Sequence, residues 1–315
     1  MKKTGKLLLC AVPALSALLA VNIISVPVML VMMVSRVLQS DMFQSTIGQA
    51  GDFTGMYYDM LMEMSKDKQF LTDVSLTTLT YYNTLAIIGF GLFYALKMKN
   101  RYPGKFKEAF GATSIPGIIC MFIGVEGIVN AVMMVLQALV PSAFEHYADL
   151  IEQSGFNQLT IVSTLATLIL APISEEIIFR GITFKLARRF TAKFWLANLI
   201  QATLFGLYHL NLVQGLYAFA IGLAFGWVYS KFHSLWASII AHLSFNFAGT
   251  WLVTIIYGTD ESLIPGKFAL VTLGSVILCA GGVFLIKKNS KAPANTDRFQ
   301  KEYALDNSDI VLLEQ

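Results

Sequence analysis

The sequence predicts an all-α protein, a polytopic membrane bundle of about eight transmembrane helices. Of its 315 residues, 56% are hydrophobic and only 14% are charged, and the mean hydropathy is +0.62. A soluble globular domain would carry roughly a quarter charged residues. Several stretches that are nearly free of Asp, Glu, Lys and Arg are long enough for the roughly 20 residues that cross a bilayer. We therefore expect a lipid bilayer, and no nucleic acid, as the partner of most of the surface.

The charge-poor stretches give the order of the predicted spans. They cover residues 7–35, 74–96, 111–140, 159–184, two spans within 194–230, then 235–257 and 268–286. The first stretch follows three lysines, as a signal peptide would, but it is longer than the roughly 7–15 apolar residues of a signal-peptide core. We expect it to be retained as a span.

These spans divide the chain into four parts. Residues 1–150 hold three spans and a long outer loop, 37–73, in which Met and Tyr residues recur at helical spacing and predict a short interfacial helix. Residues 155–255 form the predicted catalytic core. The last span lies within 256–286, and a polar cytosolic tail covers 287–315.

The placement of basic residues predicts the orientation. Most of the 23 lysine and arginine residues fall on the segments that eight spans would place on the same side as the two termini. Cytosolic loops of membrane proteins carry such an excess, so we expect both termini in the cytosol. A short basic N-terminus without an organelle signal fits the plasma membrane of a bacterium.

Three ionisable side chains, Glu175, Glu176 and Arg180, lie in the middle of an apolar stretch. Charges within a membrane are costly, so they are paired, functional or both. Glu176 and Arg180 are four residues apart and share one helix face, where they can pair. Glu175 lies about 100° round the helix from Glu176 and is left free of that pair.

Two histidines are predicted to lie near Glu175. His209 and Glu175 are at similar sequence distances from the turn near Thr191, so an antiparallel helix pair would bring them to a similar depth. His242, with Asn246 one turn later, reaches nearly the same level. A carboxylate with two histidines suits hydrolysis, because Glu can take a proton from water and return it to a leaving amine. The histidines can hold that water or donate to an oxyanion.

Other chemistries also fit these residues. Glu175, His209 and His242 match a catalytic Zn²⁺ with an open fourth position, although the HExxH signature is absent. Serine catalysis is less attractive, because Ser174 and Ser244 lack a Gly-x-Ser-x-Gly elbow and a clear base. A non-enzymatic peptide-binding or immunity protein and a proton-coupled transporter are further alternatives, since intramembrane carboxylates occur in both.

The spacing of these residues resembles the motifs of one family. Glu175-Glu176-x-x-x-Arg180, Phe205-x-x-x-His209 and His242-x-x-x-Asn246 are similar to those of the CPBP (CAAX protease and bacteriocin-processing) intramembrane proteases, also called the Abi family. The family includes the type II CAAX prenyl endopeptidase and lysostaphin resistance protein A-like proteins. The resemblance covers about residues 155–255.

The resemblance implies an intramembrane endopeptidase that acts on a membrane-associated polypeptide, in peptide processing, bacteriocin self-immunity or CAAX-type processing. Glu175 would activate water with the help of His209, while His242 and Asn246 would support the oxyanion. If the family uses a metal, Glu175, His209 and His242 would hold it. Glu176, Arg180 and Phe205 would be structural supports.

Overall fold

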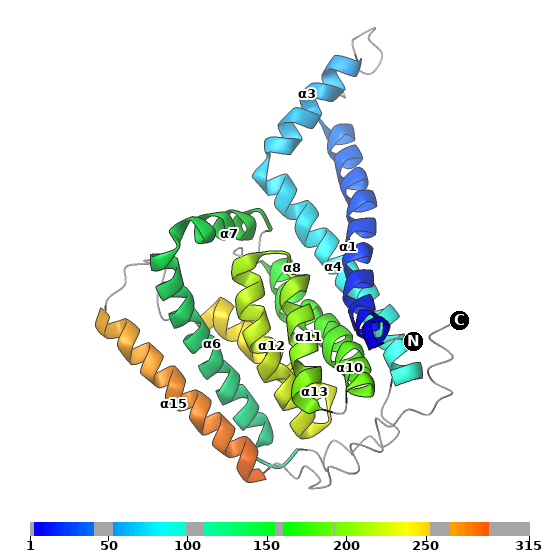
Figure 1. Cartoon of the computed structure of the whole chain (residues 1–315). Coiled ribbons are helices and arrows are strands. Elements are labelled where there is room, and N and C mark those ends of the chain that lie inside the picture. Colours follow the sequence, from blue (N-terminus) through cyan, green and yellow to red (C-terminus); the bar gives the residue numbers. More distant parts are fainter. Residues whose placement is uncertain are drawn as a thin grey trace.

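The computed structural model describes residues 3–40, 53–98, 110–154, 160–191, 193–252 and 265–289. All regular elements in these ranges are helical, which confirms the predicted fold class. Residues 41–52 of the predicted outer loop and residues 290–315 of the predicted cytosolic tail lie outside the described residues. Figure 1 shows a bundle from which one pair of helices projects.

Most of the chain forms helices long enough to define the bundle. They are α1 (Lys3–Gln39), α4 (Lys68–Phe93), α6 (Ser114–Leu139), α11 (Phe194–Tyr208), α12 (Leu212–Phe232), α13 (Leu235–Phe247) and α15 (Pro265–Asn289). Between α6 and α11, one continuous helical stretch is made of short α-helical and π-helical parts. Its parts are α8 (Ile161–Thr164), η2 (Leu165–Leu170), α9 (Ala171–Glu176), η3 (Ile177–Thr183) and α10 (Phe184–Phe190), which we call together the motif helix.

The predicted number of eight spans is not confirmed. Within the described residues, six helices are long and apolar enough to cross a membrane. The predicted spans near 194–208 and 235–257 correspond to the shorter helices α11 and α13, and α13 continues into the π-helical turn η4 (Ala248–Leu252). The 15 residues of α11 extend only about 22 Å, less than the roughly 30 Å of a hydrocarbon core. A hydrophobic stretch in the sequence does not show where its helix stops.

The predicted helix in the outer loop exists, but it does not cover the bundle. It is α3 (Phe53–Lys66), and it packs on the projecting ends of α1 and α4 (Figure 1). Met60 and Met64 are buried there against Phe70 and Val74 of α4. The Asp67 carboxylate caps α4 by accepting from the Phe70 N–H, which together with the Arg36 guanidinium lowers the pKa of Asp67.

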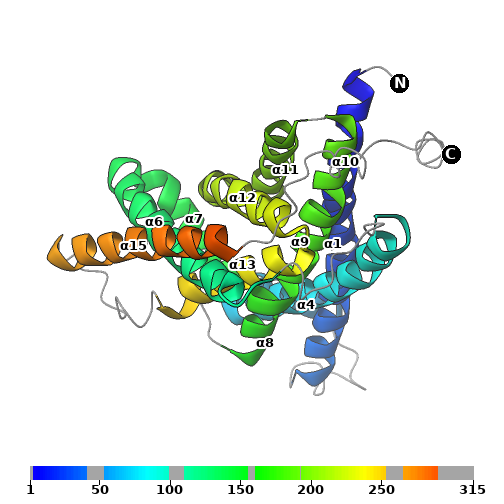
Figure 2. The same cartoon turned by 90° about the horizontal axis from the view of Figure 1, so that it is seen from below.

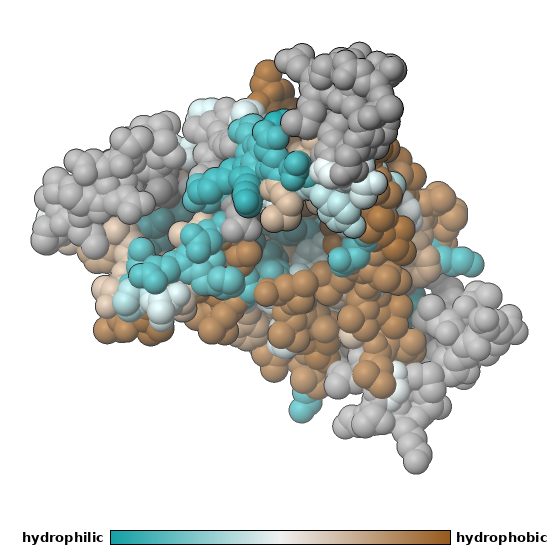
Figure 3. All heavy atoms as spheres, turned by 90° about the horizontal axis from the view of Figure 1, so that it is seen from above, coloured by the Kyte–Doolittle hydropathy of each residue, from teal (hydrophilic) through white to brown (hydrophobic). Residues whose placement is uncertain are grey.

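A further short helix, α7 (Pro141–Ser154), lies across the end of the bundle from which α3 projects (Figure 1). Lys68 at the start of α4 forms an ion pair with Glu152 of α7 at 2.7 Å. The space-filling view of this end shows hydrophilic residues around a hollow, and hydrophobic residues over the flank of the bundle (Figure 3). This end of the bundle therefore presents a polar surface, in contrast to the hydrophobic flank (Figure 3).

The motif helix lies in the middle of the molecule. Viewed along the bundle, α9 and α13 occupy the centre, with α1 and α4 on one side and α6 and α15 on the other (Figure 2). α11 and α12 form a tight antiparallel hairpin beside them. Gly206 and Gly215 make this hairpin close, because a Cβ on Gly206 would lie 2.7 Å from the Gly215 carbonyl oxygen. This contact is three residues from His209, so it fixes where α11 ends.

Candidate active site

The motif helix presents Glu175, Glu176 and Arg180 as the sequence predicts. Arg180 Nη1 donates to Glu176 Oε1 at 2.8 Å, and both side chains have no solvent exposure. The predicted ion pair is therefore present. Glu175 points elsewhere, retains 15% side-chain exposure and makes no hydrogen bond within the described part of the chain.

The Arg180 guanidinium is enclosed by aromatic rings and a backbone carbonyl. It lies 4.5 Å from the centre of the Phe205 ring and 5.0 Å from that of Phe225, and its Nη2 donates to the Gly222 carbonyl at 3.3 Å. Aromatic faces attract cations, more strongly where water is excluded. These contacts offset part of the cost of burying the charge.

Phe205 does more than fill space one turn before His209. Its ring lies edge-on to the rings of His209 (5.0 Å) and His242 (6.0 Å) and covers Arg180. A single side chain that is 1% exposed thus contacts a member of each of the three motifs. Phe205 holds the two imidazoles in fixed positions relative to the arginine.

His242 forms a hydrogen bond with Glu176 of the ion pair, and not with Glu175. Its Nδ1 lies 2.9 Å from Glu176 Oε1, whereas its Nε2 is 3.7 Å from Glu175 Oε2, which is longer than a hydrogen bond. A carboxylate only accepts, so Nδ1 carries the hydrogen and Nε2 of neutral His242 is unprotonated. Glu176 therefore has two partners and orients a histidine, a role that helical spacing within one span does not reveal.

His209 is anchored in the same way. Its Nδ1 lies 2.8 Å from the Phe205 carbonyl oxygen, so Nδ1 is again the donor and Nε2 is left for another partner. His209 ends α11, and the next residue, Leu210, has a φ of 53° in the left-handed region. That conformation is costly for a residue with a branched side chain, and Leu210 is 78% exposed. The backbone thus turns sharply just after the histidine.

Asn246 fastens α13 to the motif helix. In the π-helical turn η2 each N–H donates to the carbonyl five residues earlier, as Ala171 does to Ala166. The next residue to donate in this way would be Pro172, which has no N–H. The Thr167 carbonyl, five residues before Pro172, is therefore left without a donor in its own helix. Asn246 Nδ2 supplies that donor at 3.1 Å.

Ser174 has a structural position. Its side chain is fully buried, and its hydroxyl donates to the Asn83 side chain of α4 and to the Ala171 carbonyl. These two contacts join the motif helix to α4 and to its own preceding turn. They also place Asn83 and its neighbour Tyr82 beside Ser174 and Glu175, an arrangement that sequence reasoning missed because α4 carries no charged residue in its apolar part.

The side chains of Glu175, His209 and His242 have the right donor atoms for a metal ion, but they are not arranged around a common point. Nε2 of both histidines is unprotonated in the neutral form, and metal-binding histidines usually donate their other N–H to a carboxylate or carbonyl as these do. However, no three His, Cys, Asp or Glu side chains of the described ranges come close enough together to hold an ion. The expected set of Glu175, His209 and His242 is not assembled as a ligand group, and we derive no step through a metal.

Comparisons with known proteins agree with the motifs. Residues 157–248 match the family model of the type II CAAX prenyl endopeptidase Rce1-like proteins. Over 78 residues the chain is 40% identical to a putative membrane peptidase, YdiL, of Bacillus subtilis (strain 168), a match that covers 25% of this chain and 32% of YdiL. No solved structure matches significantly. The matched segment contains all three motifs, so this part of the chain is similar to the CAAX-type membrane endopeptidases, and the chain spans about a third of the length of the relative that it matches.

Proposed function

We propose that the chain is an intramembrane endopeptidase that hydrolyses a peptide bond of a membrane-associated polypeptide with water activated by Glu175. One observation carries the proposal. Glu176 is hydrogen-bonded to both Arg180 and His242 in a buried group, whereas Glu175 is partly exposed and makes no hydrogen bond within the described residues. A carboxylate kept free beside an organised cluster suits a general base.

The roles of the other side chains follow from their hydrogen bonds. Glu175 would take a proton from water while the water oxygen attacks the peptide carbonyl carbon, and would then give the proton to the leaving amine. His209, with Nε2 free, would accept a hydrogen bond from that water. His242, in its protonated form, would donate through Nε2 to the oxyanion while its Nδ1 donates to Glu176. Asn246 has a second N–H that could support the same oxygen.

We further propose a bacterial plasma membrane with both termini in the cytosol, on the basis of the basic residues. The turn at residues 209–211 lies at the α7 end of the bundle, since Tyr217 near the start of α12 bonds to Tyr147 of α7. The hollow at this end, bordered by hydrophilic residues, would let water reach the site (Figure 3). Hydrolysis needs such a path because the bilayer core is dry.

The test is a comparison of membrane proteomes. A strain with the wild-type chain and a strain with Glu175→Gln are grown in parallel, and terminal peptides are sequenced by mass spectrometry. We expect at least one membrane polypeptide to accumulate uncleaved in the Glu175→Gln strain, while the variant reaches the same level in the membrane. Identical sets of termini in the two strains would contradict the proposal.

Chelation tests the metal alternative. If Glu175 and the histidines activate water alone, cleavage by the purified protein should persist after exhaustive dialysis against a chelator. A zinc-dependent enzyme would lose activity and regain it when Zn²⁺ is added back. The measurement is cleavage of the polypeptide found by proteomics, with metal content of the same samples determined by mass spectrometry. Loss and zinc-dependent recovery would overturn the metal-free mechanism.

A further inference from the structure

Two tyrosines from distant parts of the chain share a hydrogen bond next to the site. The hydroxyl oxygens of Tyr82 in α4 and Tyr208 in α11 lie 2.8 Å apart. Tyr82 is 2% exposed, and Tyr208 is partly buried. Neither hydroxyl makes a second hydrogen bond to any residue in the described part of the chain.

The pair has one proton more than it uses. Two phenols carry two O–H protons, and the bond between them takes one. Buried polar hydrogens nearly always find an acceptor, and no residue in the described part of the chain accepts this second proton, so it is available to a bound molecule. A backbone carbonyl is such an acceptor, and a polypeptide substrate would bring one to this place.

The pair lies beside the reacting group. Tyr208 directly precedes His209 and its ring lies edge-on to that imidazole, with centroids 5.8 Å apart. Tyr82 precedes Asn83, which accepts from Ser174, the residue before Glu175. Glu175 interacts electrostatically with both phenol groups. A donor placed here can reach the same bound peptide that Glu175 acts on.

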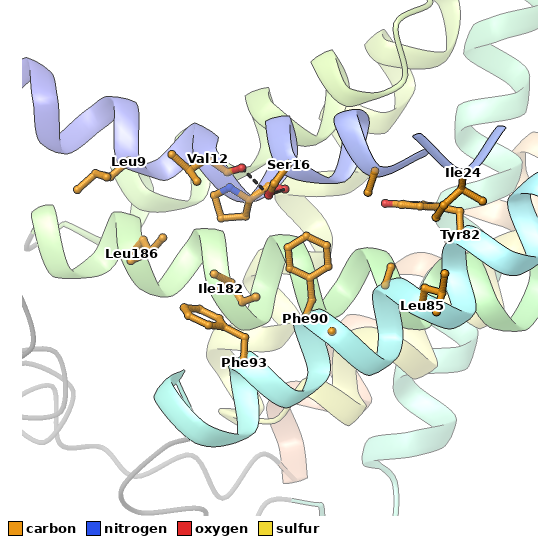
Figure 4. A pocket seen from close by; sticks show the side chains of 14 residues that line it. Leu9, Val12, Ser16, Ile24, Tyr82, Leu85, Phe90, Phe93, Ile182 and Leu186 are labelled. Carbon is orange, nitrogen blue, oxygen red and sulfur yellow. Dashed lines mark hydrogen bonds between the residues drawn. The ribbon is translucent and has the colours of Figure 1, made fainter. Parts of the chain in front are cut away.

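Tyr82 also faces a cavity on the other side. An apolar cavity of about 430 Å³ lies between α1, α4 and the η3–α10 part of the motif helix, and Tyr82 lines it near Ile24 (Figure 4). Ser16, a second hydroxyl in its wall, donates to the Val12 carbonyl of its own helix at 2.8 Å (Figure 4). The Tyr82–Tyr208 pair therefore lies where this apolar cavity meets the polar centre of the bundle.

We propose that the Tyr82–Tyr208 hydroxyl pair positions the substrate by donating its free proton to a backbone carbonyl of the polypeptide beside Glu175. The proposal rests on the proposed endopeptidase function and adds a hydroxyl pair of which one member contacts the substrate and the other orients it. The proton is shared, not transferred, so the pair strengthens binding of the peptide and leaves the proton transfers to Glu175. Loss of the donating hydroxyl removes this hydrogen bond, and loss of the other hydroxyl removes the group that orients the donor, so both changes should weaken binding.

The test measures binding apart from cleavage. The Glu175→Gln protein in lipid nanodiscs is titrated against a library of fluorescein-labelled apolar decapeptides, with empty nanodiscs subtracted, and binding is followed by anisotropy. One neutral hydrogen bond contributes about 0.5–1.5 kcal/mol, so Tyr82→Phe and Tyr208→Phe should each weaken binding about 3- to 10-fold. The double variant should bind no more weakly than either single variant. Tyr81→Phe is the matched control, because Tyr81 is the preceding residue of α4 and is 58% exposed.

In the protein with Glu175 intact, the same hydroxyl losses should raise KM about 3- to 10-fold and leave kcat nearly unchanged, since the bond is made in both ground and transition states. Equal affinities in all variants, equal losses in Tyr81→Phe, a fall in kcat at constant KM, or no binding of any peptide would each overturn the assignment. If the hydroxyl losses weaken binding as expected but the wild-type chain cleaves nothing, the endopeptidase function fails and the positioning role stands.

Discussion

Glu175→Gln is expected to abolish peptide hydrolysis while leaving the protein folded. A positioned general base contributes about 10²–10⁴-fold to a rate, and an amide cannot take the proton of the attacking water. Glutamine has the shape of glutamate, and Glu175 makes no hydrogen bond in the described structure that the change would break. The measurement is the initial rate of cleavage by purified protein, together with its unfolding temperature.

Glu176→Gln provides the contrast for this experiment. Glu176 accepts from both Arg180 and His242, so its loss should lower the unfolding temperature as well as the rate. Of these two variants, only Glu175→Gln is expected to lose activity without a fall in the unfolding temperature. A Glu175→Gln protein that cleaves at the wild-type rate would contradict the assignment of the base.

Arg180→Met should destabilise the fold strongly. Removing one partner of a buried ion pair leaves the other charge uncompensated and costs about 3–5 kcal/mol. Here the change also leaves the Phe205 and Phe225 rings without the cation they enclose. The free energy of unfolding in mixed micelles is the quantity to measure.

A second ion pair in the same chain serves as the control. Arg36 pairs with Asp67 at the projecting end of α1, where the two side chains are 51% and 26% exposed. Surface pairs of this kind contribute about 0–1 kcal/mol, so Arg36→Met should change stability little. If Arg180→Met and Arg36→Met lowered the free energy of unfolding by similar amounts, burial of the Arg180 pair would not explain its contribution to stability. The double change Glu176→Gln with Arg180→Met should recover part of the loss.

The sequence was sufficient for features that lie within one helix or depend on composition. The fold class follows from hydropathy, and the Glu176–Arg180 pair follows from a spacing of four residues. The free position of Glu175 follows from the angle between successive residues of a helix. The first depends on composition and the other two on the local geometry of one helix, and the structure confirms all three.

Features that join distant helices could not be derived in this way. The rotation of α13, which turns His242 Nδ1 to Glu176, depends on packing against the whole bundle. Tyr82 and Tyr208 carry no charge and have no fixed spacing, so nothing in their pattern marks them as partners. The span count failed because a hydrophobic stretch does not show that α11 ends after 15 residues. One contact between helices could have been predicted. Pro172 within an apolar helix implies a backbone carbonyl without a donor, and the Asn246 side chain can supply that donor.

Polar contacts fasten the motif helix to its neighbours, among them those from Asn246 to the Thr167 carbonyl, from Ser174 to Asn83, and from His242 to Glu176. The first of these lies about two turns before the other two, and together they fix the rotation and the height of the helix. The dipoles around Glu175 are therefore already oriented before any substrate arrives. A preorganised environment needs little rearrangement as charge develops in the transition state. The free-energy cost of ordering these groups is met once, when the chain folds, and does not recur at each turnover.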